Sequence, residues 1–599
     1  MTARFCRVAV DSPVWALDRP FDYEIPARFI GRVAVGSVVR VPLHGRRVRA
    51  FVTELVDAPE VATTKPLSAL VSEQPLYTSD EIAVARTIAR RYLATVGQVL
   101  HHGVPGRYSA PKDSDPPVRG APVASDRPPW LEEERGPWEE PRHEALLVAP
   151  SPAAEEEAVS YAATRVRGGV LVVAPHPARV EEMARALGGV ALHGDSRPGQ
   201  RAAAWAAARE GAARVVCVSR AGILAPVPDL ALVWVCGAHE RTLKEERTPR
   251  LHALRAARMR ADQAGAAFVA SSPAPPLELW ADPGVRHLQV ARSAYRTVRP
   301  EVVGLRSDPV TPRLLDTVRS AIASGRDALV VITRRGSALR VRCRDCGWYP
   351  RCPDCRVGLV VMSDRLRCRG CGRDQRIPDR CASCQGERLD AAGWGSDRLA
   401  DSLGSHDLGA PVLKVDADTA LPKKRPRPAV VVGTFAAVGA VRSADLGAVV
   451  AADLDQLLGR PDFRAAERTL GALEGLAGLV GPGGRMLVQT REAEHHAVQA
   501  FTRRSYRHFA ERELPLREQA AYPPYGVVVA ADVEAAHVDA LAAAASSGGG
   551  LLVGSIPRPG GRMSSLVRAP ELDPLIEPLR EFVASHATAR VDVDPVDVL

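Results

Sequence analysis

Cysteines in four closely spaced pairs are the residues of this chain best suited to chemistry. Each pair has the spacing Cys-x2-Cys, and the pairs are Cys343/Cys346, Cys352/Cys355, Cys368/Cys371 and Cys381/Cys384. A turn of this spacing presents two thiolates on one side of a loop, and two such turns complete a tetrahedral all-sulfur shell around Zn²⁺. Four pairs therefore predict two closed zinc shells, and their role is structural because no coordination position stays open for water.

Other chemistry for these cysteines is possible in principle. Four thiolates also hold iron–sulfur clusters, but paired turns of this spacing are typical of zinc. A disulfide framework is not expected, because the rest of the chain reads as cytosolic. Spacing alone leaves open which two pairs share a metal.

Length and composition set wide limits on the class of protein. A chain of 599 residues with 46% hydrophobic residues is large enough for several domains. No apolar run follows a basic start and none reaches the length of a membrane span, so we expect a soluble, cytoplasmic protein without a membrane partner. The net charge of +9 suits a phosphate backbone, although arginine-rich composition can also reflect the genome. Three further cysteines, Cys6, Cys217 and Cys236, lie in apolar strand-like runs and are expected to be buried and inert.

Residues 1 to about 57 alternate between apolar and polar in strand fashion, which predicts a small β-rich domain. Between two of these runs lies Pro20-Phe21-Asp22-Tyr23, where two aromatic rings flank a carboxylate. A base could stack on such rings while Asp22 accepts a hydrogen bond from a sugar hydroxyl or a base edge. The alternative is that Phe21 and Tyr23 are core residues. Residues 80–100 predict one amphipathic helix, and the proline-rich stretch 105–143 predicts an extended or disordered linker.

Two consecutive α/β series follow. Apolar runs at 145–149, 170–174, 214–218, 231–235 and 266–270 alternate with helix-length segments, which predicts buried parallel strands. A second series has its apolar runs at 328–332, 411–415, 429–432, 448–451 and 485–489, and the cysteine segment interrupts it after the first run. Residues 511–599 predict a compact α+β domain.

Several motifs connect the chain to a known family. They are Phe21-Asp22-Tyr23, 39–42 with Gly45, Thr333-Arg-Arg-Gly336, 393–398, 462–468, Gln489-Thr490, Tyr522-Pro-Pro-Tyr525 and Val593-Asp594-Pro595. With the cysteine spacing, these residues resemble the PriA family of replication restart proteins, also called primosomal protein N′, in the shortened form found in actinobacteria. The resemblance extends over nearly the whole chain.

The resemblance implies a multi-domain α/β fold. It comprises an N-terminal domain for the 3′ end of DNA (1–106), a proline-rich linker where the family has a winged helix (107–143), a degenerate RecA-like helicase lobe (144–285), a second degenerate lobe in two parts (286–342 and 386–510), a two-zinc insertion (343–385) and a C-terminal α+β domain (511–599).

Site residues are also implied by the resemblance. Phe21, Asp22 and Tyr23 would contact the terminal nucleotide of a 3′ end, and Gly45 and Lys65 stand at matching pocket positions. The family pairs its zinc ligands in a nested way, so that Cys343, Cys346, Cys381 and Cys384 would hold one Zn²⁺ and Cys352, Cys355, Cys368 and Cys371 the other.

The motor motifs are where the chain departs from this family. A phosphate-cradling loop of the form GxxxxGK[ST] should follow the first lobe strand, but residues 150–157 contain no glycine and no lysine, two prolines and three glutamates. The Asp-Glu-Glu-His motif is replaced by Cys236-Gly-Ala-His239, the Ser-Ala-Thr motif by Ser271-Ser-Pro273, and the arginines expected at the γ-phosphate by Leu479 and Pro482. Gly433-Thr434 remains. We therefore expect neither ATP as a cofactor nor helicase or ATPase activity, because charge stabilisation is lost at several points.

The leading hypothesis is a non-catalytic, zinc-containing DNA-binding protein of the nucleoid. It would bind stalled or abandoned forks at the 3′ end of the leading strand and nucleate primosome assembly for reloading the replicative helicase. Other primosome proteins, the replicative helicase and single-stranded DNA-binding protein are the partners that the resemblance implies. The alternatives are an active ATP-dependent 3′–5′ helicase and a zinc-ribbon adaptor that binds proteins. Three basic stretches are candidate DNA contacts: Arg46-Arg47, Lys423-Lys424-Arg425 and Arg503-Arg504.

Overall fold

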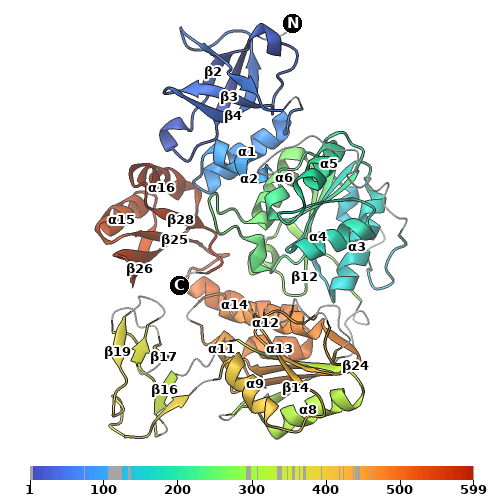
Figure 1. Cartoon of the computed structure of the whole chain (residues 1–599), viewed down its shortest axis with the longest axis vertical. Coiled ribbons are helices and arrows are strands. Elements are labelled where there is room, and N and C mark those ends of the chain that lie inside the picture. Colours follow the sequence, from blue (N-terminus) through green and yellow to red (C-terminus); the bar gives the residue numbers. More distant parts are fainter. Residues whose placement is uncertain are drawn as a thin grey trace.

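The computed structural model places the described residues in four folded units and a small cysteine-bearing insertion (Figure 1). The described residues are 4–72, 74–104, 125–132, 136–291, 298–305, 308–333, 340–343, 345–346, 348–353, 358–362, 365–368, 373–392, 394–416, 419–422, 424–435, 438, 441, 446–460 and 462–597. Among them we find no helix whose length and apolarity would let it cross a bilayer.

The N-terminal unit is the β-rich domain that the sequence predicts. Its described strands form one sheet in the order β5-β2-β1-β4-β3-β6. They are β1 (Phe5–Val10), β2 (Phe21–Glu24), β3 (Val38–Leu43), β4 (Arg46–Val56), β5 (Lys65–Pro66) and β6 (Ala69–Leu70). Alternate residues of β1 are buried, which is the pattern of a strand with one face on a core.

The helix predicted over residues 80–100 is two helices, α1 (Ser79–Arg91) and α2 (Val96–Gly103). The chain turns at Leu93, which has a φ of 51°. Thr95 then caps α2, because its hydroxyl accepts from the Gln98 N–H while the Gln98 side chain accepts from the Thr95 N–H. A cap of this kind starts a new helix, and one continuous helix was therefore the wrong interpretation.

Seven described strands form the parallel sheet of the first α/β unit, in the order β13-β7-β12-β11-β8-β10-β9. They are β7 (Glu144–Val148), β8 (Gly169–Val173), β9 (Val190–Leu192), β10 (Val215–Val218), β11 (Leu230–Val235), β12 (Ala267–Ser272) and β13 (Val285–His287). The sequence missed β9 and β13, whose three residues are too few for a clear apolar run. The helices are α3 (Pro152–Arg165), α4 (Pro177–Ala186), α5 (Pro198–Arg209), α6 (Ala253–Ala264) and α7 (Leu277–Trp280).

Helices cover both faces of this sheet. α3 and α4 pack on one face, and α5 and α6 pack on the other. The strands are buried on both sides, which explains why they read as continuous apolar runs. Cys217 and Cys236 are fully buried here, as Cys6 is in the N-terminal sheet, so the burial predicted for these three cysteines is confirmed.

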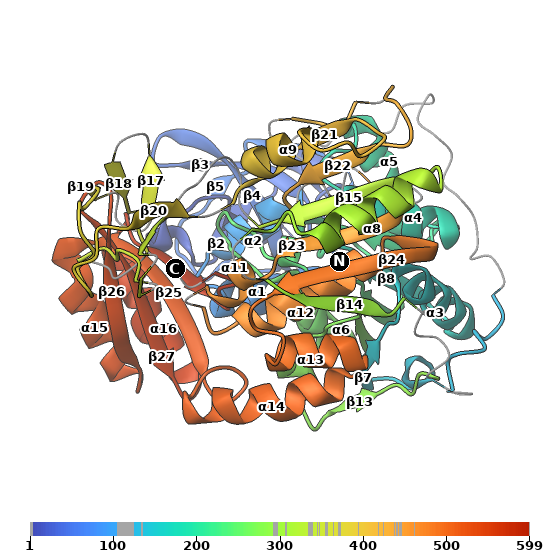
Figure 2. The same cartoon turned by 90° about the horizontal axis from the view of Figure 1, so that it is seen from below.

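The second α/β unit is also parallel, and its described strands follow the order β14-β24-β23-β15-β22-β21. They are β14 (Pro300–Gly304), β15 (Asp327–Ile332), β21 (Val412–Val415), β22 (Val430–Gly433), β23 (Leu446–Asp453) and β24 (Val480–Thr490). The helices are α8 (Pro312–Ala323), α9 (Ser396–Gly404), α11 (Asp455–Leu458), α12 (Ala465–Ala477), α13 (His496–Arg503) and α14 (Tyr506–Gln519). Figure 2 shows α8 and α9 on one face of the sheet and α12, α13 and α14 on the other.

The cysteine-bearing insertion leaves the second unit after β15 and returns before α9. It contains the antiparallel pair β16 (Arg340–Cys343) and β20 (Leu389–Ala392), and the antiparallel strands β17 (Val360–Met362), β18 (Arg365–Arg367) and β19 (Asp374–Arg376). Both views place it on the same side of the molecule as the C-terminal unit (Figures 1 and 2).

The C-terminal unit is an α+β sandwich of one sheet and two described helices. The antiparallel sheet has the order β26-β27-β25-β28, formed by β25 (Val527–Glu534), β26 (Leu551–Arg558), β27 (Arg562–Ala569) and β28 (Arg590–Val593). α15 (Val538–Ser547) and α16 (Asp573–Ser585) bury their apolar residues in a core that continues into the first α/β unit.

Part of the proline-rich stretch is not a free linker. Leu131 and Trp138 are 1% and 2% exposed and belong to the core beneath α3. Leu131 also forms an isolated bridge with Val290. The prediction of an extended or disordered linker is therefore wrong for these residues, because two large apolar side chains find a place against the sheet.

Polar contacts hold the units together. Glu81 of α1 and Arg260 of α6 form a buried ion pair at 3.1 Å that joins the N-terminal unit to the first α/β unit. Near the end of the described chain, Asp594 accepts from Arg91 of the N-terminal unit at 2.9 Å. In the same segment, Asp597 pairs with Arg468 of the second α/β unit at 3.0 Å and also with Arg241 of the first. We call residues 592–597 the acidic tail.

Candidate metal centre, nucleic-acid interface and nucleotide cleft

Three of the four cysteine pairs begin in the same tight turn. The N–H of the first cysteine donates to the carbonyl five residues later, from Cys343 to Trp348, from Cys368 to Arg373 and from Cys381 to Gly386, over 2.7–2.8 Å. In the two pairs whose cysteines are both described, Cys343/Cys346 and Cys381/Cys384, the thiols gather in one group, which is the geometry that a metal knuckle needs.

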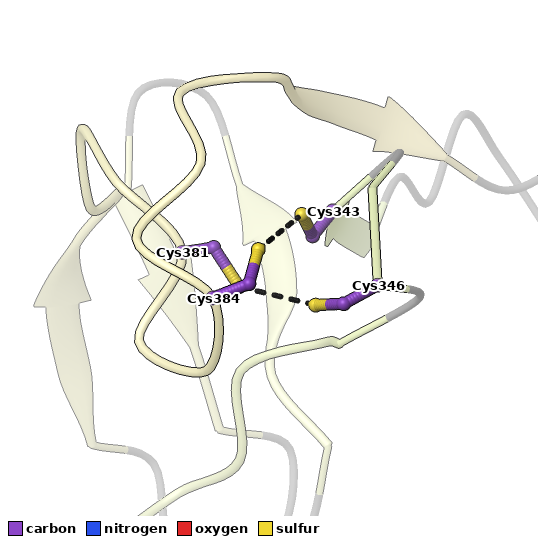
Figure 3. A group of neighbouring side chains, drawn as sticks. All are labelled: Cys343, Cys346, Cys381 and Cys384. Carbon is purple, nitrogen blue, oxygen red and sulfur yellow. Dashed lines mark hydrogen bonds between the residues drawn. The ribbon is translucent and has the colours of Figure 1, made fainter.

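The structure brings the first and last pairs together. β16 pairs with β20, so Cys343 lies opposite Leu389 and near the final turn. The Sγ atoms of Cys343 and Cys384 are 3.5 Å apart, as are those of Cys346 and Cys381 (Figure 3). All four Sγ atoms lie within 4.8 Å of one another. Four sulfurs about 2.3 Å from a central zinc would be roughly 3.8 Å apart, so this set fits a tetrahedral metal.

Electrostatics in this set favours a bound cation. The Trp348 N–H lowers the pKa of Cys346 to about 7. The Gly386 N–H favours the thiolate of Cys384, but hydrogen bonds with Cys346 and Cys343 outweigh it and raise the pKa of Cys384 to about 12. Four neighbouring thiols cannot all ionise without a positive charge between them, and a metal ion supplies that charge.

The other two pairs are described only in part. Cys352 and Cys368 are fully buried and belong to one small core cluster with Leu366. Cys355 and Cys371 lie outside the described residues. A second metal at these four positions therefore stays a prediction.

The residues expected at a DNA 3′ end lie on β2 and its neighbours. Tyr23 is buried, 4% exposed, and its hydroxyl donates to the Pro42 carbonyl at 3.1 Å. Phe21 lies on the same face of β2 but is only half-buried. Tyr23 is thus a core residue, as the alternative interpretation held, whereas the Phe21 ring keeps an open part. Contact of either residue with a nucleotide stays a prediction.

Asp22 points to the opposite face of β2. One of its oxygens accepts from the Arg7 side chain at 3.1 Å, and the other accepts from the Glu60 N–H at 2.6 Å. These bonds fix the carboxylate in place. The Asp22 side chain is only 5% exposed, and its contact with a nucleotide stays a prediction.

Gly45 and Lys65, the other two residues expected at the 3′ end, belong to the same sheet as Phe21. Lys65 is exposed on β5 and lies opposite Tyr23 in the ladder. Gly45 forms the two-residue turn between β3 and β4 with His44, and both have positive φ, which favours glycine. No atom lies within 4 Å of the point where a Cβ on Gly45 would stand, so the space beside it is open.

Sequence reasoning missed one cation beside this surface. The Arg19 guanidinium lies 4.9 Å from the centre of the Phe21 ring. Arg19 lies in the loop before β2, so no strand periodicity in the sequence pointed to this contact.

The basic stretches differ in how far they can face DNA. Arg46 and Arg47 are exposed on β4, in the same unit as the Phe21 surface. Arg425, in contrast, is buried in an ion pair with Asp327 at 2.6 Å, and Arg504 donates to the Val298 carbonyl. Lys423 lies outside the described residues. The prediction that Arg425 faces DNA is therefore wrong, because a buried carboxylate takes its charge.

A small cavity lies where the end of β7 meets the second α/β unit. Between the end of β7 and α12 of the second unit, the cavity has a volume of about 60 Å³ and is lined by Ala149, Ser151, Pro273, Ala477 and Gly478 among others. Pockets for small molecules are typically about 300–1,000 Å³. Ser151 also uses its hydroxyl to cap α3, accepting from the Ala154 N–H at 3.1 Å.

A larger cavity of about 720 Å³ lies between the α/β units beside the acidic tail. Its lining is mixed in charge, and the charges pair with each other. Arg464 bonds to Glu278, for example, and pairs with Glu467 at 3.5 Å. Thr434, from the surviving Gly-Thr motif, is in this lining.

Comparisons with known proteins agree with these features. A model of the PriA 3′ DNA-binding domain matches residues 7–105, which include all five residues expected at the 3′ end. A probable replication restart protein PriA of Mycobacterium tuberculosis is 32% identical over 574 residues, covering 88% of this chain and 87% of that protein. The chain belongs to the PriA family. The PriA relative of Treponema pallidum is 26% identical and matches 97% of this chain, and that of Bacillus subtilis is 27% identical over 56% of it. PriA resemblance therefore covers both α/β units and the cysteine insertion as well as the N-terminal unit.

Proposed function

We propose that this PriA family member binds DNA forks at a free 3′ end and nucleates primosome assembly without hydrolysing ATP. The match of residues 7–105 to the family's 3′ DNA-binding domain carries the DNA part of the proposal. The Asp22 carboxylate lies on the opposite face of β2 and is held by Arg7, whereas the half-buried Phe21 ring and the exposed Lys65 offer a stacking face and a positive charge. These are the contacts that a terminal nucleotide uses.

Fluorescence anisotropy tests this binding. The ligand is a labelled fork whose leading strand ends in a free 3′-OH at the branch, and the reference is the same fork with a blocked 3′ end. Phe21→Ala should weaken binding to the first fork by about 5- to 150-fold, because loss of one stacked base costs roughly 1–3 kcal/mol. Phe29→Ala, another half-buried aromatic of this unit, is the matched control and should bind as the wild type does. Equal affinity of the wild type for both forks would exclude the 3′-end pocket.

The missing phosphate loop, together with the small size of the cavity at the end of β7, supports the absence of ATP hydrolysis. A sensitive phosphate-release assay with forked DNA, beside calorimetry with ATP, tests it. Fork-stimulated hydrolysis at a helicase-like rate would establish the alternative, an active ATP-dependent helicase. Heat of binding without turnover would show that the 720 Å³ cavity holds nucleotide without acting as a motor.

We propose two structural zinc ions, one held by Cys343, Cys346, Cys381 and Cys384, the other by Cys352, Cys355, Cys368 and Cys371. The sulfur distances of the first set and the shared burial of Cys352 and Cys368 support this pairing. The insertion that they fold is the proposed contact surface for other primosome proteins, the replicative helicase and single-stranded DNA-binding protein. A flat, weak salt dependence of DNA affinity would favour the alternative role as a protein adaptor, since DNA contacts release counterions.

A further inference from the structure

Glu155 is a buried acid at a position where ATP-binding chains carry a base. When the pattern GxxxxGK[ST] is placed on residues 149–156, directly after β7, Glu155 falls on the lysine. That lysine and the loop N–H groups normally surround the β/γ-phosphates of a nucleotide. The charge at this position is therefore reversed.

The Glu155 side chain turns toward the carboxyl ends of β11 and β12 rather than toward solvent. It is buried, and its Oε1 accepts from the Gly237 N–H at 2.9 Å and from the Ser271 hydroxyl at 2.6 Å. Gly237 follows β11 and Ser271 ends β12, so both donors come from the carboxyl ends of parallel strands. Trp234 donates to the Ser271 oxygen at 2.8 Å and fixes the direction of that hydroxyl. Ligands of parallel sheets bind at this edge.

A buried cation completes the surroundings of the carboxylate. Arg179 of α4 lies 3.5 Å from the second oxygen of Glu155, and it donates to the Pro152 carbonyl at 2.7 Å. Its other nitrogen bonds to Glu156 at 3.0 Å. Burial raises the pKa of Glu155, while Arg179, the Ser271 hydroxyl and the Gly237 N–H each oppose that rise. A backbone N–H, a hydroxyl and a guanidinium converging on two oxygens is the donor set of an oxyanion site.

We propose that these donors form an oxyanion seat and that the chain fills it with its own Glu155 carboxylate. The side chain takes the place of a phosphate group and ties α3 to β11 and β12. The first α/β unit is then held in one arrangement without a ligand. This inference concerns the protein alone and is independent of binding at a DNA 3′ end.

Removal of the carboxylate should turn the seat into a binding site for small oxyanions. Glu155→Ala removes the acceptor of the Gly237 N–H, the shorter of the two acceptors of the Ser271 hydroxyl and one carboxylate beside Arg179, so its Tm should fall several degrees below that of the wild type. Acetate or inorganic phosphate should restore part of this loss in a concentration-dependent way. With a Kd of about 5 mM, 50 mM ligand would raise the folded-to-unfolded ratio roughly elevenfold. Sodium chloride at matched ionic strength should not do so.

Two further variants make the experiment decisive. Glu157→Ala removes the same charge from an exposed position of α3 and should show neither the loss nor the recovery. Glu155→Gln fills the seat with a side chain of equal size, so acetate and phosphate should not stabilise it beyond chloride. The inference is refuted if Glu155→Ala is as stable as Glu157→Ala, or if the recovery by phosphate is the same in Glu155→Gln. Should Glu155→Ala fail to fold, folding it in phosphate but not in chloride tests the same claim.

Discussion

The nested arrangement of the two proposed metal sets can be tested by pairs of cysteine substitutions. Cys346 and Cys384 belong to one set, although 37 residues separate them in sequence, and Cys352 belongs to the other. The double variant Cys346→Ser/Cys384→Ser should therefore lose one zinc and keep one. Cys346→Ser/Cys352→Ser should lose both. A sequential arrangement, with neighbouring pairs sharing a metal, predicts the opposite outcome for each.

The size of the effect follows from the geometry. The sulfur pairs at 3.5 Å need to move only a few tenths of an ångström to reach the roughly 3.8 Å of a zinc–thiolate shell, so the set is almost preformed. Structural zinc sites bind with about 10–16 kcal/mol, and one ligand of four carries about 2.5–4 kcal/mol of that. Each serine should thus weaken its site by about 100- to 1,000-fold. Elemental analysis after dialysis against a chelator measures zinc per chain. Two zinc ions retained by Cys346→Ser/Cys384→Ser would refute the reasoning.

Three further predictions concern the joints between units. Glu81→Gln leaves Arg260 buried without its partner and should lower stability by about 3–5 kcal/mol in urea titrations, whereas Glu54→Gln, an exposed ion-pair partner, should cost under about 1 kcal/mol. Burial and the nearby Lys244 charge lower the pKa of His252 to about 3, so the folded state resists its protonation. The stability that neutral His252 contributes is complete above its ordinary pKa of 6.5 and is lost as the pH falls toward 3. From pH 7 to 5 the free energy of unfolding of the wild type should therefore fall by about 2 kcal/mol more than that of His252→Gln. Equal changes of the unfolding free energy with pH in the two proteins would contradict this. Asp594→Asn removes the charge that binds Arg91 and should loosen the contact between the N-terminal and C-terminal units, so limited proteolysis should become faster. An unchanged cleavage rate would show that this ion pair does not hold the two units together.

The sequence predicts the fold well where one pattern determines the outcome. Runs such as Val170–Val173 are apolar on both faces, and they form central parallel strands because helices cover both sides. The break between α1 and α2 was missed, although Thr95 and Gln98 have the spacing of a capping box, which is the signal that could have predicted it. Short edge strands such as β9 carry no such pattern. Their position depends on the neighbouring strands.

The candidate sites depend more on distant contacts. The four cysteine pairs were clear from spacing, but the pairing of the first with the last depends on the contact of β16, which ends at Cys343, with β20, which contains no cysteine. Three consecutive glutamates after β7 predicted repulsion of a nucleotide. The sequence did not show which glutamate is buried, or that Arg179 and Ser271 contact it, because these residues come from elements far apart in the chain. Burial of Trp138 likewise came from the sheet and not from its proline-rich surroundings.

The acidic tail has a consequence for how DNA affinity is measured. Its carboxylates join three units through partly exposed ion pairs, such as that of Asp597 with Arg468. Added salt screens such pairs as well as the contacts of a protein with phosphates. A plot of log affinity against log salt would then report the loosening of the protein together with the counterions released by DNA. A variant lacking the tail charges, titrated in parallel, would separate the two contributions and give the true number of phosphate contacts.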